Sequence, residues 1–144
     1  MRFWDSSAVV PLLVDEPSSG AVHATHAQDA DIAAWWGTEV ECVSALVRLE
    51  REGILGSPSL IDALERLDGL AAAWLEVQPI QRVRQASIRL LRVHALHAAD
   101  ALQLAAAIAA AEDHPETLPF VTLDDRLGQA AEREGFVVTR PTGP

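Results

Sequence analysis

The 144-residue sequence has no lysine, no tyrosine and a single cysteine, Cys42. One cysteine cannot form an internal disulfide, and no cysteine and histidine residues have the spacing of a zinc site. The absence of lysine excludes aspartate-nucleophile phosphatases and phosphoacceptor receiver domains, both of which need one. The segment "DSSA" at 5–8 also lacks the second aspartate that such a phosphatase carries two residues after the first.

Basic residues and long apolar runs are scarce as well. Eleven arginines stand against 21 acidic residues, and the net charge of −10 argues against a general positive surface for nucleic acid. Any nucleic-acid contact must therefore be local or bridged by metal. The longest apolar run, 101–111, is too short to span a bilayer, and no basic segment precedes a long apolar run near residue 1. We expect a soluble, cytoplasmic protein with no membrane partner.

Short apolar segments alternate with segments of helical periodicity. This pattern predicts an α/β fold in which a short, mainly parallel sheet is flanked by helices. We expect a single domain over residues 1–140 and a flexible tail at 141–144. Strands are expected at these four places: 2–5, 31–36, 119–122 and 136–140.

Several helix boundaries have recognisable signals. Thr38 is expected to cap a helix that stops near Gly53. Ser57 is expected to cap a helix over 57–75, with Pro58 at its first position. In the helical segment that follows the first strand, Pro11 lacks a backbone N–H, which predicts a late start or a tight first turn.

Two acidic residues follow expected strands directly. Asp5 ends the first strand, and Asp124 follows the strand that ends at Thr122. Open α/β sheets bind their ligands at this edge, so both are candidate site residues. For each residue alone, a helix N-cap is the more common role.

Two further acids lie on expected helices. Asp100 heads a segment in which only Gln103 is polar between 101 and 111, so the helix should be buried and its carboxylate should need a partner. The positive end of the helix dipole is a partial alternative explanation. Glu41 shares one helix side with Ser44, Ala45 and Arg48, a stripe that either faces a gap or is an ordinary surface.

Taken together, the four acids favour a metal site. Carboxylates brought into one apolar cleft repel one another, and some take up protons unless a divalent cation neutralises them. Mg²⁺ is held by a few carboxylates and retains several waters, so its ligands need no fixed sequence spacing.

Four ordered segments resemble the motifs of PIN-domain ribonucleases, in particular the VapC-type toxins of bacterial toxin–antitoxin pairs. The resemblance covers essentially the whole chain. The segments are "DSSAVVPLLVDEP" (5–17), "EVECVSALVR" (39–48), "HAADALQLAAA" (97–107) and "FVTLDDRLGQAAEREG" (120–135).

This resemblance implies roles for six residues. The catalytic, metal-binding acids would be Asp5, Glu41, Asp100 and Asp124, with Ser6 and Thr122 as supporting hydroxyls. Two positions depart from the family pattern. Gln103 replaces a common histidine, and Asp125 competes with Asp124 as the fourth acid, although the spacing to 126–127 favours Asp124.

The activity that the resemblance implies is metal-dependent endoribonuclease cleavage. One or two Mg²⁺ or Mn²⁺ ions would activate water for hydrolysis of RNA phosphodiester bonds, leaving 5′-phosphate and 3′-hydroxyl ends. The implied partners are RNA, a VapB-like antitoxin and a second copy of the chain in a homodimer. The alternative is a catalytically inactive PIN-like module that binds RNA or protein.

Two other features attract attention. The segment 77–99 has no acid and carries four arginines, which suits a solvated helix face and is also the best candidate for an RNA backbone contact. Trp35 and Trp36 end the second expected strand. Adjacent strand residues point to opposite faces, so at least one ring should lie in the core and the other is a candidate interface residue.

Overall fold

Five short strands form one sheet in the order β3-β2-β1-β4-β5, and every neighbouring pair is parallel. The computed structural model describes residues 1–142. The elements in chain order are β1 (Arg2–Trp4), α1 (Ser6–Leu13), α2 (Ser19–Gln28), β2 (Ile32–Trp35), α3 (Thr38–Arg51), α4 (Ser57–Ala73), β3 (Leu75–Val77), α5 (Gln81–Val93), α6 (Ala98–Ala110), the 3₁₀ helix η1 (Pro115–Thr117), β4 (Phe120–Val121), α7 (Asp125–Arg133) and β5 (Val138–Thr139). The predicted α/β fold with a parallel sheet and flanking helices is confirmed.

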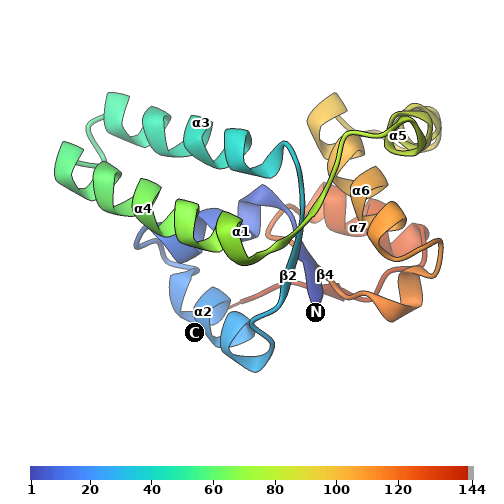
Figure 1. Cartoon of the computed structure of the whole chain (residues 1–144), viewed down its shortest axis with the longest axis horizontal. Coiled ribbons are helices and arrows are strands. Elements are labelled where there is room, and N and C mark those ends of the chain that lie inside the picture. The colour runs from blue at the N-terminus through green and yellow to red at the C-terminus, as the bar shows by residue number, and fades with distance from the viewer. Residues whose placement is uncertain (143–144) are drawn as a thin grey trace.

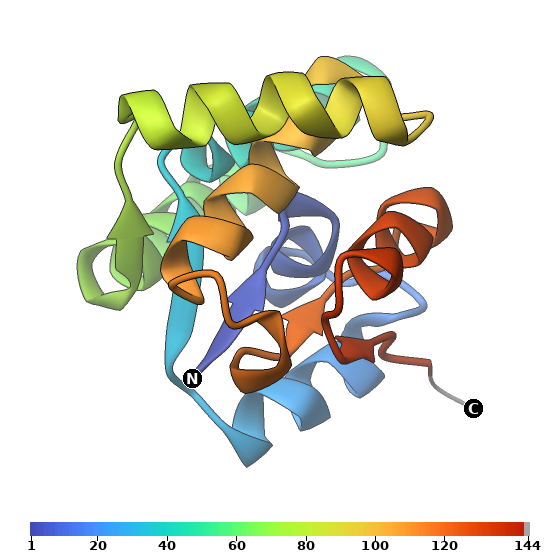
Figure 2. The ribbon, with the colours of Figure 1, turned by 90° about the vertical axis from the view of Figure 1, so that its right-hand side faces the viewer.

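Helices cover both faces of this sheet (Figure 1). Because side chains alternate along a strand, Phe3 packs into one core cluster and Trp4 into the other. The cluster around Phe3 contains residues of α5, α6 and α7, whereas the cluster around Trp4 contains residues of α1 to α4. Figure 2 shows α5 crossing over α6 on the outer side of the first cluster.

The connections create a crevice beside the central strand. The helix that follows β1, α1, packs on one face of the sheet, and the helix that follows β4, α7, packs on the other. Since β1 and β4 are parallel neighbours, the chain leaves their adjacent carboxyl ends toward opposite faces of the sheet. Such a switch point is where open α/β sheets bind ligands.

Two predicted helix caps are wrong. The N-cap of α3 is Gly37, because Thr38 is buried and its Oγ1 accepts a hydrogen bond from Gln103 instead of capping the helix. The N-cap of α4 is Gly56, and Ser57 is the first helical residue, with Pro58 following it. The hydroxyl of Ser57 also binds another side chain, because it donates to Glu50 Oε2 at 3.2 Å.

The sheet contains a strand that periodicity missed. Residues 74–75 were expected to end a helix, but α4 stops at Ala73 and residues 75–77 pair with β2. Pro11 lies inside α1, which begins at Ser6, so that helix does not start late. Trp35 is 6% exposed and Trp36 is 50% exposed, which confirms the expected division of the two rings.

The chain end and the helices bear on two further expectations. In the tail expected at 141–144, Pro141 is buried and Thr142 is exposed, and residues 143–144 lie outside the described range. No helix within that range combines the length and apolar character that crossing a membrane requires.

Candidate active site

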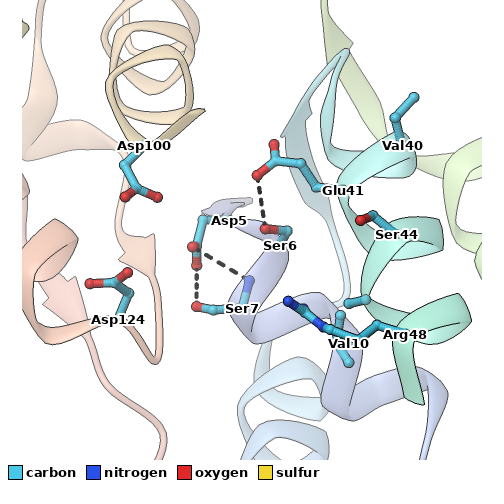
Figure 3. A pocket seen from close by; sticks show the side chains of 11 residues that line it. Asp5, Ser6, Ser7, Val10, Val40, Glu41, Ser44, Arg48, Asp100 and Asp124 are labelled. Atoms are coloured by element: carbon cyan, nitrogen blue, oxygen red, sulfur yellow. Dashed lines mark hydrogen bonds between the residues drawn. The ribbon is translucent and has the colours of Figure 1, made fainter. Parts of the chain in front are cut away.

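The four predicted acids line one cavity of about 520 Å³. Asp5 and Asp124 reach it from the carboxyl ends of β1 and β4, Glu41 from α3 and Asp100 from the first turn of α6 (Figure 3). The other lining residues are Ser6, Ser7, Val10, Val40, Ser44, Ala45 and Arg48. Thr122 is buried behind the cavity and does not line it.

Asp5 is both a helix cap and a cavity residue. Its backbone is extended, and its carboxylate accepts hydrogen bonds from Ser7 Oγ at 2.8 Å and from the Ser7 backbone N at 3.4 Å. Asp5, and neither Ser6 nor Ser7, is therefore the N-cap of α1. Burial raises the pKa of Asp5 to about 7, against hydrogen bonds from Ser7 and Thr122 that lower it.

A set of hydroxyl contacts joins the ends of β1 and β4. Ser7 Oγ accepts a hydrogen bond from the Leu123 backbone N at 2.9 Å and lies 3.3 Å from Thr122 Oγ1. Thr122 Oγ1 also accepts from the Asp124 backbone N at 3.0 Å. These contacts hold the segment that carries Asp124 against the one that carries Asp5, so Thr122 acts through backbone position.

Glu41 is held by side chains from two other helices. Ser6 Oγ donates to Glu41 Oε1 at 3.2 Å, and Gln103 Nε2 donates to Glu41 Oε2 at 2.9 Å. Burial raises the pKa of Glu41, these two hydrogen bonds lower it, and the charge of Asp100 raises it further. The carboxylate therefore lies in a partly desolvated position with a fixed orientation.

The carboxylates of Asp100 and Asp124 differ in the hydrogen bonds that they accept. Burial and then the charge of Asp124 raise the pKa of Asp100, while His97 and Arg126 act in the opposite direction. No side chain or backbone N–H within residues 1–142 donates a hydrogen bond to Asp100. Asp124 caps α7 by accepting from the Leu127 backbone N at 3.0 Å. The neighbouring Asp125 is outside the cavity, with its side chain 90% exposed.

The donor set suits a hard divalent cation. Carboxylate and hydroxyl oxygens are the ligands that Mg²⁺ and Mn²⁺ prefer, and a cation would relieve the burial and repulsion that raise three of these pKa values. Across the described residues, no three Asp, Glu, His or Cys side chains are arranged to hold one ion directly. The residues therefore fit an ion held by one or two carboxylates at a time and otherwise by water, which is the usual coordination of Mg²⁺.

Sequence reasoning missed or left undecided four residues of the site. Ser7, rather than Ser6, donates a side-chain hydrogen bond to Asp5. The only sequence signal for this role was that Ser7 lies two residues after Asp5. Gln103 was noted as a departure, and the structure makes it a donor to Glu41. Of the two interpretations of the α3 stripe, the one that faces a gap is confirmed, because Ser44 and Arg48 line the cavity with Glu41.

The arginine-rich segment lies on α5, away from this cavity. Arg82 pairs with Asp113, and Arg89 Nη2 pairs with Glu134 Oε1 at 2.6 Å. His94 Nε2 lies 2.7 Å from the other Glu134 oxygen. Part of this positive charge is thus used in contacts within the chain.

No family model matches this sequence, and no curated protein does either. Solved structures match over nearly its whole length. FitAcB from Neisseria gonorrhoeae is 20% identical, with 98% of each chain covered and a TM-score of 0.68. FitAB bound to an IR36 DNA fragment is 19% identical, with 98% of this chain and 95% of that chain covered and a TM-score of 0.67. A toxin–antitoxin complex from Klebsiella pneumoniae is 16% identical, with 100% of each chain covered and a TM-score of 0.66. At these identities the likeness establishes a shared fold.

Proposed function

We propose that this chain is a metal-dependent endoribonuclease of the PIN-domain type and the toxin of a type II toxin–antitoxin pair. The observation that carries the proposal is the convergence of Asp5, Glu41, Asp100 and Asp124, from four separate elements, on one cavity. A purely structural role explains Asp5 and Asp124 as caps but gives no reason for all four acids to meet in a cavity where burial and repulsion raise the pKa values of Asp5, Glu41 and Asp100.

Each side chain has a part in this mechanism. Asp5 and Asp100 would hold Mg²⁺ or Mn²⁺, with Glu41 and Asp124 binding directly or through water. When bound, such an ion would supply a water of lowered pKa and would neutralise charge that develops on the phosphate. Ser7 fixes the Asp5 carboxylate, while Ser6 and Gln103 fix that of Glu41, so the acids need little rearrangement when substrate binds.

The matched structures support the antitoxin partner, and the resemblance of the four motifs implies the homodimer. One matched structure is a toxin–antitoxin complex, and the likeness to it covers all of this chain. We therefore expect a cognate VapB-like antitoxin to bind this chain, and we expect the chain to form a homodimer. Co-expression with the product of a short neighbouring open reading frame should yield a complex in which RNA cleavage is suppressed.

The nuclease is tested with purified chain, free of antitoxin, and end-labelled structured RNAs. Cleavage should require Mg²⁺ or Mn²⁺, stop with a chelator and leave 5′-phosphate ends. Asp100→Asn should reduce it by at least about 100-fold, since removing even an indirect metal partner costs 10- to 100-fold. Asp68→Asn, an exposed change on α4, should cleave like the wild type.

Two results would overturn the proposed nuclease function. One is no cleavage by the wild type with any divalent metal, and the other is equal cleavage by Asp100→Asn. Either result favours the inactive PIN-like binding module. Such a module would bind RNA or protein equally well with and without metal.

A further inference from the structure

Arg48 is the one cationic side chain among the residues that line the acidic cavity. It lies on α3 two turns beyond Glu41, with Ser44 between them on the same side of the helix. In Figure 3, Asp100 and Asp124 lie on one side of the cavity, and Ser44 and Arg48 lie on the other. Glu41 lies on the same side as Ser44 and Arg48, so α3 brings a carboxylate and two hydrogen-bond donors to the cavity.

Arg48 is not used to neutralise the acids. Its guanidinium makes no ion pair and no hydrogen bond with any residue between 1 and 142, although four carboxylates line the same cavity. Other arginines of this chain do pair with acids, as Arg89 does with Glu134. An arginine whose role was to screen the cavity would be expected to contact one of its carboxylates. Arg48 is instead exposed and available to an anion from outside the chain.

We propose that Arg48 and Ser44 form a phosphate-binding subsite for an RNA chain. A guanidinium binds phosphate oxygens through two parallel N–H donors, and the Ser44 hydroxyl adds a third. The subsite rests on the proposed nuclease function, because it places the RNA backbone along α3 with another part of that backbone at the acids.

The spacing favours a phosphate other than the one that reacts. Seven residues of α-helix separate Glu41 from Arg48, which is about 10 Å along the helix axis. The subsite therefore holds a neighbouring phosphate of the chain. With a net charge of −10, the protein repels polyanions as a whole, so a local cation beside the cavity is what lets RNA approach it.

Fluorescence anisotropy with a short labelled single-stranded RNA tests this subsite. The variants are made in an Asp100→Asn background, so that cleavage does not interfere. Arg48→Gln should weaken binding by at least about 10-fold, since the charge-assisted hydrogen bonds to the phosphate are lost. The slope of log K against log salt should fall by about 0.7, the value for one phosphate contact on a single strand. Ser44→Ala should weaken binding less than Arg48→Gln does.

The matched control is Arg51→Gln. Arg51 is exposed on the same helix but does not line the cavity, so the affinity and salt slope should stay as in the background protein. In the otherwise wild-type enzyme, Arg48→Gln should raise KM and leave kcat nearly unchanged, because it acts on binding away from the reacting phosphate.

Equal affinity and salt slope for Arg48→Gln and Arg51→Gln would overturn the subsite, and so would an absence of RNA binding at low salt. These outcomes differ from a failure of the nuclease. If RNA binds through Arg48 but the wild type never cleaves, the subsite stands and the catalytic proposal fails. If the wild type cleaves and Arg48→Gln changes neither KM nor affinity, the nuclease stands and the subsite fails.

Discussion

Gln103 Nε2 on α6 donates a hydrogen bond to Glu41 Oε2 on α3, and the two atoms lie 2.9 Å apart. The same nitrogen donates to Thr38 Oγ1 at 2.9 Å. Gln103 is buried and lies one turn beyond Asp100 on the same helix. The helix that carries one acid of the cavity thus also orients a second acid on a different helix.

Gln103→Leu should impair the proposed reaction through Glu41. In the wild type, the hydrogen bond from Gln103 lowers the pKa of Glu41. Its loss in the variant should therefore raise that pKa further. We expect kcat to fall about 10-fold, the lower end for a residue that supports a metal ligand, and the acid limb of the pH–rate profile to move to higher pH.

Thr38→Val is the control. It removes the other acceptor of Gln103 and should leave the pH–rate profile in place. An unchanged profile in Gln103→Leu would contradict the positioning role, and NMR titration of the Glu41 carboxyl checks it without activity.

Asp5 makes the stability of the metal-free chain fall as pH rises. Burial raises the pKa of Asp5 from 3.8 to about 7 in the folded chain, so between these values the folded state holds a proton that the unfolded state has released. Fewer protons on the unfolded state mean that the free energy of unfolding decreases with pH across this window. Asp5→Asn keeps a good N-cap and should be more stable than the wild type at pH 8, by up to about 4 kcal/mol.

Urea unfolding at pH 5 and pH 8 measures this effect. The advantage of Asp5→Asn should grow between the two pH values, whereas the exposed Asp68→Asn should show no such trend. The same Asp5→Asn variant should lose metal-dependent cleavage. If it unfolds or is less stable than the wild type at pH 8, Asp5 has a structural role as the cap of α1.

A divalent cation should stabilise the folded chain at pH 8. Binding to the folded state alone at 100 times Kd adds about 2.7 kcal/mol, and each kcal/mol raises the Tm of a chain of this size by a few degrees. We expect Mg²⁺ to raise the Tm by roughly 5 °C or more at constant ionic strength, with a smaller rise at pH 5, where Asp5 is protonated. Asp100→Asn should lose most of this rise and Asp68→Asn should retain it. Equal responses of these two variants would contradict a metal site at the cavity.

Glu134 joins α5 to α7 by accepting hydrogen bonds from Arg89 at 2.6 Å and from His94 at 2.7 Å. Burial alone would raise the pKa of Glu134, but the contacts with Arg89 and His94 outweigh it, and the net shift is downward. A lowered folded-state pKa contributes stability that is present at neutral pH and is lost as pH falls through that pKa. Glu134→Gln should therefore reduce the free energy of unfolding by about 1–3 kcal/mol at pH 7.

The difference between Glu134→Gln and the wild type should shrink as pH falls through the lowered pKa of folded Glu134, because the wild-type carboxyl group is then protonated as well. Chemical unfolding at pH 7 and at an acidic pH at which this carboxyl group is protonated measures it. Glu65→Gln, an exposed change on α4, is the control and should be nearly neutral at both. A loss that is the same at both pH values would show that shape, rather than charge, accounts for the effect.

Local signals in the sequence predicted most of the elements. The helix expected to stop near Gly53 does so, because Gly53 has a positive φ, which glycine adopts without strain. Strand β3 was missed, since three residues at 75–77 are too few to show alternation and become a strand by pairing with β2. The caps at Thr38 and Ser57 were wrong because local preference gives a helix start to within a residue or two.

The candidate site was predictable to a smaller degree. Asp5 and Asp124 could be placed at one edge of the sheet, because both follow parallel strands. Helical periodicity put Glu41 and Arg48 on one side of α3, but it did not say whether that side faced solvent or a cavity. The contacts of Ser7 with Asp5 and of Gln103 with Glu41 depend on cap geometry and on the packing of α6 against its neighbours, which periodicity does not describe.

The sequence by itself determined the order of the helices and of every strand but β3, the parallel α/β fold and the identity of the acids, because these depend on residue type and on spacing within one element. Only the tertiary structure decided that the four carboxylates share a cavity, that Asp5 caps a helix while it lines that cavity, and that the Arg48 guanidinium lies there without a partner among residues 1–142. These relationships join residues as far apart as 5 and 124. They arise from packing helices on two faces of one sheet, which no local pattern specifies.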